Sequence, residues 1–176
     1  MISFEIENIK SGNIAQYKEM FKRYYKPLVY FSYRYVKDVQ IAEDIIQDVF
    51  INIWNKRETL DFSLNFKSYL FSSVRNHSLM HLNKESKFEH VNLKLLTEKS
   101  DNNPDTIVES KELEKIVAKI ILELPEKRRE VFCMSRFDKL TYSEIADALS
   151  ISVNTVETQM SRALKYIRKR TKSLFK

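Results

Sequence analysis

The sequence has almost no glycine or proline: it contains one Gly and three Pro among 176 residues. Tight turns and hairpins depend on these two residues, so their scarcity argues against an all-β or α/β fold. It predicts an all-α fold whose helices are joined by short corners. Hydrophobic residues make up 43% of the chain, which is enough for a core and argues against global disorder.

Cysteine is nearly absent as well. Cys133 is the only one, so one chain can form neither a disulfide nor a cysteine-based zinc site, as expected for a reducing cytosol. It follows Val131 and Phe132 and is interpreted as a small buried thiol. There is no apolar run long enough to span a membrane, and residues 1–13 lack the features of a signal peptide. We therefore expect a cytoplasmic protein.

The combinations of residues that enzymes use are also missing. Gly12 stands alone and cannot form a glycine-rich phosphate loop. His77 and His81 are four residues apart on one predicted helix and could grip a metal ion, but no third ligand is evident nearby. Structural or surface roles are favoured for both. We expect no catalytic residues, no metal and no cofactor.

Residues 1–84 have helical periodicity and predict four helices. Asn13 is a candidate N-cap, and apolar residues recur at helical spacing from Ile14. Proline cannot donate a backbone hydrogen bond inside a helix, so we expect a break at Lys26-Pro27 between a first and a second helix.

The third helix is expected to begin after Asp38, a candidate N-cap, and the fourth to run from Phe66 to about Lys84. The helical period fails over Glu58–Asn65, which predicts a loop. The fourth helix should turn Phe66, Tyr69, Leu70, Val74 and His77 inward. The third should bury the apolar stripe Ile41, Ile45, Ile46, Val49, Phe50, Ile53 and Trp54.

The composition changes over residues 85–110, which contain three Lys and six Asp or Glu, a net charge of −3. Turn-forming residues around Pro104 add to the contrast. We interpret 85–110 as a flexible acidic linker. It separates a module of four helices at 1–84 from a second module at 111–176.

The second module ends in two short helices. Asp105 or Thr106 can cap an earlier helix, and Pro125 suits the first turn of a helix over Glu126–Arg136. The stretch "TYSE" from Thr141 is a capping box that opens the next helix.

Ser150-Ile151-Ser152 forms the corner before a last helix over Val153 to about Lys172. Two helices joined in this way predict a helix-turn-helix unit. Its inward face should comprise Ile145, Ala146, Leu149, Ile151, Val153, Val156, Met160 and Leu164.

The outward face of the last helix has short polar groups first and cations later. After Glu157 come seven Lys or Arg and no acid, in a chain of net charge +6. A helix that reads DNA needs groups that hydrogen-bond base edges, with cations beside them for phosphates. A solvated helix tail is the less favoured alternative. The predicted DNA-contacting residues are Asn154, Thr155, Glu157, Thr158, Ser161, Arg162 and Lys165.

Two blocks of the sequence resemble a known family. "LPEKRREVFCMSRFDKLTYSEIADALSISVNTVETQMSRAL" is similar to region 4 of bacterial RNA polymerase sigma factors, and "AEDIIQDVFINIWNKRETLDFSLNFKSYLFSSVRNHSL" is similar to region 2. Both occur in order with only a short linker between them. This arrangement resembles the extracytoplasmic-function subgroup of the sigma-70 family. The resemblance covers about 150 of the 176 residues.

The resemblance implies three binding surfaces, with core RNA polymerase and promoter DNA as partners. The outward residues of the last helix would read the −35 element. Lys67, Arg75 and Asn76 would bind the −10 element, with Asn76 contacting an unstacked base. Tyr69 and Phe71 could stack on bases, although core packing is the commoner role for such aromatics. The core-polymerase surface would comprise Asp44, Gln47, Asp48 and Ile51.

Members of this subgroup are often held inactive by an anti-sigma factor, so the resemblance implies such a partner here. One departure from the family concerns the corner, where Ser150 stands at a position that is commonly glycine. Positive φ at a residue other than glycine costs on the order of 1 kcal/mol, so we expect strain there.

Three alternatives remain open from the sequence. A conventional helix-turn-helix regulator would bind DNA without polymerase. An enzyme with a DNA-binding tail, such as a recombinase, would need a strand-rich core, for which residues 1–84 show no pattern. A purely helical interaction protein would leave the charge asymmetry of the last helix unexplained.

Overall fold

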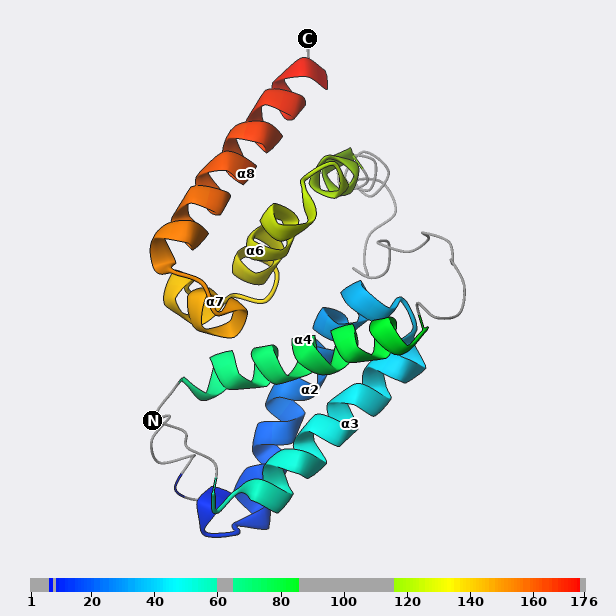
Figure 1. Ribbon diagram of the computed structural model, residues 1–176, viewed down its shortest axis with the longest axis vertical. Helices are drawn as coiled ribbons and strands as arrows, with labels where there is room; N and C mark the ends of the chain where they lie inside the picture. Colours follow the sequence, from blue (N-terminus) through cyan, green and yellow to red (C-terminus); the bar gives the residue numbers. More distant parts are fainter. Residues whose placement is uncertain (1–6, 8, 60–64, 86–115, 175–176) are drawn as a thin grey trace, which may run out of the picture. The chain divides into compact units, whose positions relative to one another are not determined.

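The computed structural model describes residues 7, 9–59, 65–85 and 116–174, which form two compact helical units (Figure 1). All regular secondary structure in these ranges is helical, so the all-α prediction is confirmed. The predicted linker and the boundary at 110/111 lie outside the described residues, apart from Glu85 at the end of a helix. The same holds for the predicted caps Asp105 and Thr106, and for most of the predicted loop at 58–65.

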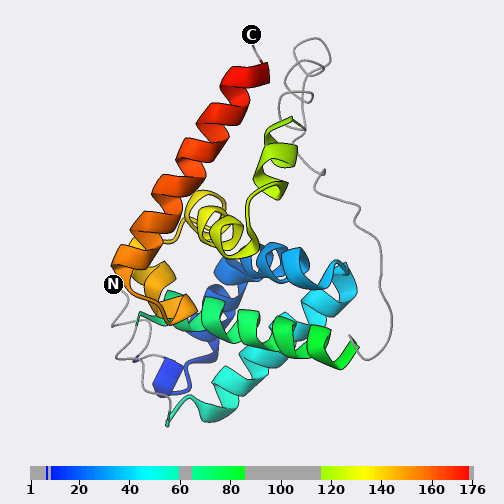
Figure 2. The same ribbon diagram turned by 45° about the horizontal axis from the view of Figure 1, so that its top comes forward.

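The N-terminal unit consists of α2 (Ile14–Val36), α3 (Val39–Lys56) and α4 (Phe66–Glu85), and each helix packs against the other two (Figure 2). Buried serines connect α2 to α4, because the hydroxyls of Ser32 and Ser78 lie 2.9 Å apart. A hydrogen bond satisfies both polar groups where water cannot reach. The apolar core between the helices includes Leu28, Phe31, Ile46, Ile53, Leu70, Phe71 and Val74.

Pro27 does not break the first helical run. The prediction of two helices separated at Lys26-Pro27 is wrong, because α2 continues through Pro27 without interruption. Pro27 lies on the solvent side of α2, where water can hydrate the backbone carbonyl that loses its partner. Leu28 and Phe31 just beyond it are fully buried. Burial of such side chains contributes about 1.5–3 kcal/mol each, which offsets the roughly 3 kcal/mol cost of the proline.

Aromatic contacts join α2 to α3. The rings of Phe21 and Phe50 meet edge to face with centroids 4.9 Å apart, and the Tyr17 hydroxyl donates a hydrogen bond to the Phe50 carbonyl. Burial raises the pKa of Tyr17 above its ordinary value. Trp54, predicted to lie in the core, is only half-buried. It contacts Tyr17 at 4.8 Å and lies under the Arg57 guanidinium at 4.7 Å, because the end of α3 reaches the edge of the unit.

The N-terminal ends of the helices follow the sequence closely, because short polar side chains satisfy their free backbone N–H groups. The Thr141 hydroxyl accepts from the Glu144 N–H at 3.2 Å, and the Glu144 carboxylate accepts from the Thr141 N–H at 2.8 Å, which confirms the capping box. The predicted caps Asn13 and Asp38 are confirmed by single bonds, from Gln16 N to Asn13 (3.2 Å) and from Ile41 N to Asp38 (3.0 Å). Ser152 caps α8 in the same way and accepts from Thr155 N at 3.1 Å.

The C-terminal unit contains a helical segment at 116–122, then α6 (Glu126–Arg136), α7 (Tyr142–Leu149) and α8 (Val153–Leu174). α6 packs against α8. Pro125 is the N-cap of α6 and lies one position before the predicted first turn. The arrangement of α7, the corner and α8 confirms the helix-turn-helix prediction.

The inward face of α8 is rotated from the predicted one. Val156 and Met160 are buried as expected, but Val153 and Leu164 are 41% and 36% exposed. Ala163 is fully buried in place of Leu164. Spacings of four and three residues put 156, 160 and 163 on one stripe, and position 164 lies about 100° further round the helix from 163. The helical phase therefore buries Ala163 and leaves Leu164 partly exposed.

The corner between α7 and α8 is a Schellman turn without glycine. The Ile151 N–H donates to the Ala146 carbonyl at 3.0 Å, and the Ser150 N–H donates to the Asp147 carbonyl at 3.2 Å. Ser150 has φ of 53°, in the left-handed region that such turns require. The strain expected at Ser150 is therefore present. Lys37 and Lys139, at φ of 58° and 56°, follow α2 and α6 in the same conformation.

An ion pair holds the distal half of α8. The Arg170 guanidinium donates two hydrogen bonds to the Glu123 carboxylate, at 2.7 and 2.8 Å, and the Tyr166 hydroxyl donates a third at 2.8 Å. These bonds, with Arg170 first among the causes, lower the pKa of Glu123 to about 2. The same carboxylate raises the pKa values of Tyr166 and Arg170. This fork, the pair of bonds from Arg170 to Glu123, connects α8 to the residues that follow the helical segment 116–122.

Ser150→Gly is expected to raise the free energy of unfolding by about 0.5–1 kcal/mol, because glycine adopts positive φ without steric cost. Urea denaturation of the full chain measures the change. Ser150→Ala keeps a β-carbon and is the matched control, with no gain expected. Equal stabilities for the glycine and alanine variants would show that the corner is not strained.

Glu123→Gln should make the stability of the C-terminal unit less sensitive to a fall in pH. The folded-state pKa of Glu123 lies below its ordinary value of 4.5, so its stabilisation is present above about pH 4.5 and is lost as pH falls toward 2. The melting temperature of the variant should be lower than that of the unaltered chain at pH 6, and the gap should narrow below pH 4.5 and close as pH approaches 2.

Glu157→Gln is the matched control for that measurement, because Glu157 makes no ion pair with any residue the structure describes. A gap between the unaltered chain and Glu123→Gln that stays constant from pH 6 to pH 2.5 would contradict the assigned role of the fork.

Candidate functional site

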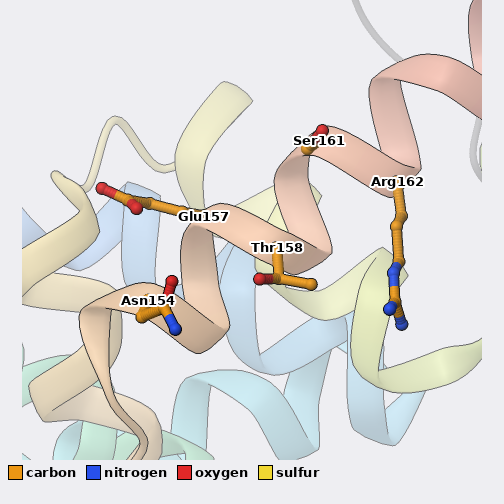
Figure 3. A pocket seen from close by; sticks show the side chains of 5 residues that line it. All are labelled: Asn154, Glu157, Thr158, Ser161 and Arg162. Carbon is orange, nitrogen blue, oxygen red and sulfur yellow. The ribbon is translucent and has the colours of Figure 1, made fainter.

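The solvent face of α8 presents all seven predicted DNA-contacting residues, and each is exposed. α8 places them there because Val156, Met160 and Ala163 occupy the opposite, buried side. Figure 3 shows five of these side chains projecting from successive turns of the same stretch of helix. They line one open hollow on its surface: Asn154, Glu157, Thr158, Ser161 and Arg162.

The polar groups on this face differ in their availability. The Thr155 hydroxyl lies 2.8 Å from the Ser152 hydroxyl, so it belongs to the N-terminal cap of α8. The side chains of Asn154, Thr158 and Ser161 make no hydrogen bond to another described residue. These three groups can therefore donate to or accept from an external partner without losing an internal bond.

α3 presents a second surface, which is acidic. Asp44, Gln47 and Asp48 are exposed, and Ile51 one turn further on is 57% exposed. Spacings of three and four residues place the four on one side of the helix. The opposite side of α3 is in the core. α3 thus brings together all four residues predicted for the polymerase-binding surface.

Glu43 is held apart from this acidic surface. It hydrogen-bonds Tyr25 of α2, and the pKa of Tyr25 is raised first by burial and then by this bond and the charges of Glu43 and Asp44. Glu43 is only half-exposed. Glu43 therefore supports packing between α2 and α3, while Asp44 and Asp48 remain exposed to an external partner.

α4 does not bring its three predicted residues together. Asn76 is exposed, whereas Lys67 and Arg75 are half-buried and already interact within the protein. Nine residues separate Lys67 from Asn76, which puts them on opposite sides of an α-helix at about 100° per residue. Tyr69, half-buried, does share the face of Asn76, seven residues away.

Phe71 has the core role that the sequence favoured and not the stacking role, because its side chain is 1% exposed and packs edge to face on Phe31 at 4.9 Å. Sequence reasoning also missed Met80, which is 57% exposed one turn beyond Asn76. Its signal was the four-residue spacing from Asn76, which places both on one side of α4.

The histidines of α4 have local partners, since a ring nitrogen of His77 lies 2.9 Å from the Ser73 carbonyl. Across the described ranges, no cluster of three or more His, Cys, Asp or Glu could hold a metal ion. Cys133 is buried, as predicted. None of the helices described is both long and apolar enough to cross a membrane.

Comparison with protein families finds two matches, one in each unit. Residues 20–88 match the model for sigma-70 region 2, and residues 114–167 match the model for sigma-70 region 4. This pair of regions, in this order, defines an RNA polymerase sigma factor, the class of protein that directs polymerase to promoters. The chain belongs to the sigma-70 family, in its extracytoplasmic-function subgroup.

Relatives match along nearly the whole chain. The ECF RNA polymerase sigma factor SigW of Bacillus subtilis is 27% identical, over 99% of this chain and 98% of the relative. The ECF RNA polymerase sigma-E factor of Escherichia coli K12 is 24% identical, over 97% of this chain and 94% of the relative.

Two solved structures share the fold. CnrH, in complex with the cytosolic domain of CnrY, superposes with a TM-score of 0.68 at 19% identity, covering 98% of this chain and 97% of that one. The sigma factor RpoE of Bartonella quintana, in complex with the anti-sigma factor NepR, gives 0.66 at 19% identity, covering 88% and 96%.

Proposed function

We propose that this chain uses α3 to bind core RNA polymerase, α8 to bind the −35 element and α4 to bind the −10 element. The observation that carries the proposal is a pair of solvent faces that differ in charge: α3 presents exposed acids and an apolar residue, whereas α8 presents mainly neutral polar groups followed by cations. A protein that must hold both a polymerase and a polyanion needs two such surfaces of different charge.

α8 is suited to the major groove. The short side chains of Asn154, Thr158 and Ser161 can donate to and accept from base edges, and Arg162 can bind a guanine edge or a phosphate. Glu157 can accept from the amino group of cytosine. Lys165 and the Ser152-capped N-terminus of α8 add positive charge close to the phosphates.

α3 is suited to a basic partner surface. Asp44 and Asp48 lie four residues apart, so their charges repel in the free protein by a few tenths of a kcal/mol. Cations on the polymerase would relieve that repulsion, and such complementarity also speeds association. Ile51 gives the surface an apolar group that can be buried on docking, and Gln47 can hydrogen-bond at its centre.

α4 would meet the −10 element through Asn76. A primary amide both donates and accepts along the edge of an unstacked base, which suits capture of a single base from melted DNA. Tyr69 on the same face could contact that base, while Lys67 and Arg75 would hold phosphates from other sides of the helix.

The module boundaries that follow from this division are 1–84, 85–110 and 111–176. A linker of 26 residues reaches at most about 85–95 Å, which exceeds the roughly 50 Å between promoter elements. One chain can therefore hold both elements at once, and the tether makes the joint affinity larger than either alone. The protein would act in the cytoplasm without catalysing a reaction itself, and the melting energy would come from the holoenzyme.

We also propose an anti-sigma factor as a regulatory partner. RpoE of Bartonella quintana, which shares the fold, was solved in complex with the anti-sigma factor NepR. The exposed apolar groups Ile51, Val153 and Leu164 would give such a partner places to bury hydrophobic surface.

Run-off transcription tests the proposed function. Purified core polymerase with this chain should initiate from a subset of fragments of the source genome, whereas core polymerase alone should not. A gel shift of the chain without polymerase should show only weak binding to those fragments. Tight, sequence-specific binding without polymerase, together with no initiation, would instead support a conventional helix-turn-helix regulator.

Asp48→Arg should weaken binding to core polymerase at least tenfold, or about 1.4 kcal/mol, because it puts a cation against a basic partner surface. Biolayer interferometry on immobilised core polymerase measures the change. Glu19→Arg makes the same charge change at an exposed position of α2 and should bind normally. Unchanged binding by Asp48→Arg, with an unaltered melting temperature, would exclude α3 as the docking helix.

A further inference from the structure

The solvent face of α8 continues well beyond the hollow that holds the base-contacting residues. Successive spacings of four and three residues keep a single stripe of side chains within about 80° of arc along the whole helix. The first half of the stripe is neutral and polar, and the second half is cationic. From the N-terminal end, its members are Asn154, Thr158, Ser161, Lys165, Arg168 and Lys172.

The cations of the second half have no acidic partner among the residues that the structure describes. Lys165, Arg168 and Lys172 are exposed, and none forms an ion pair within the described part of the chain. No acid follows Glu157 in the sequence to neutralise them.

Arg170 provides the contrast on the same helix. It projects from the opposite side, where the Glu123 carboxylate binds it at 2.7 Å. Arg170 therefore fixes the distal half of α8, whereas the three cations of the stripe face solvent.

The length of the stripe exceeds what the major groove can contain. Eleven residues separate Ser161 from Lys172, a rise of about 16 Å, whereas the groove is about 12 Å wide. A recognition helix contacts bases through its N-terminal residues. Its later turns therefore extend beyond the groove.

We propose that Lys165, Arg168 and Lys172 form a phosphate track: a sequence-independent anchor on duplex DNA next to the bases read by the first half of α8. The inference rests on the proposed function of α8. Duplex DNA is the occupant, because the track shares one face with the polar residues and has the opposite charge to phosphate. The first half of the helix supplies sequence preference, and the track supplies affinity that depends on salt.

The salt dependence of binding to a random-sequence duplex of 30 base pairs tests the track. Each neutralised phosphate contributes about 0.9 to the slope of log K against log salt. Arg168→Gln with Lys172→Gln should therefore reduce the slope of the full chain by about 1.8. Between 50 and 200 mM KCl, the double variant should lose about 12-fold less affinity than the unaltered chain, as measured by fluorescence anisotropy.

Two double variants serve as controls. Arg168→Lys with Lys172→Arg keeps both charges and should keep the original slope. Lys119→Gln with Lys127→Gln removes two exposed cations of the same unit that lie outside α8 and should also keep it. The proposal would be overturned if Arg168→Gln with Lys172→Gln kept the slope of the unaltered chain. It would also be overturned if Lys119→Gln with Lys127→Gln reduced the slope by the same amount as the track variant.

Failure of the track can be distinguished from failure of the proposed function. If the unaltered chain initiates transcription but the track variant shows the original slope, only the track is excluded. If the unaltered chain never supports initiation yet the slopes differ as expected, α8 binds duplex DNA in some other role. Thr158→Ala completes the set: it should change which fragments are transcribed while leaving the slope for random duplex unchanged.

Discussion

The functional surfaces of this protein depend on the burial of one stripe of each amphipathic helix. In α3, burial of Ile46 and Ile53 forces Asp44 and Asp48 toward solvent. In α8, the buried row of Val156, Met160 and Ala163 forces the polar and basic residues outward in the same way. Removing a core side chain would therefore rotate or release a binding surface and not only lower stability. The acidic face and the basic face are, in physical terms, consequences of packing.

Because glycine is scarce, other residues must adopt the strained left-handed conformation in the connections between helices. Three residues other than glycine hold positive φ: Lys37 directly after α2, Lys139 in the connection between α6 and α7, and Ser150 in the turn between α7 and α8. The hydrogen bonds of the Schellman turn and the cap from Ser152 hold the corner despite this strain. At the other end of α8, Arg170 and Glu123 fix the distal half. α8 is thus restrained at both ends, which keeps its solvent stripe in one orientation.

The sequence could predict the all-α fold, the helix caps and the exposed faces, because each depends on local chemistry and regular spacing. It could not predict that α2 passes through Pro27, since buried neighbours offset a local penalty that is visible in the sequence. It also placed Leu164 in the buried stripe of α8 where the structure has Ala163, because either of two adjacent apolar residues can continue such a stripe in the sequence pattern. For Phe71 the sequence left base stacking open beside the favoured core role, because an aromatic residue at helical spacing has the same pattern in a core and at a binding surface.

The central claim is that α3 faces polymerase and α8 faces DNA in the same complex. Photo-crosslinking in an assembled holoenzyme–promoter complex tests it most directly, with p-benzoylphenylalanine placed at position 48 or position 158. The account predicts that the probe at 48 crosslinks to a polymerase subunit and not to DNA, and that the probe at 158 crosslinks to DNA upstream of the start site. Crosslinks to DNA from position 48, or to polymerase alone from position 158, would contradict it.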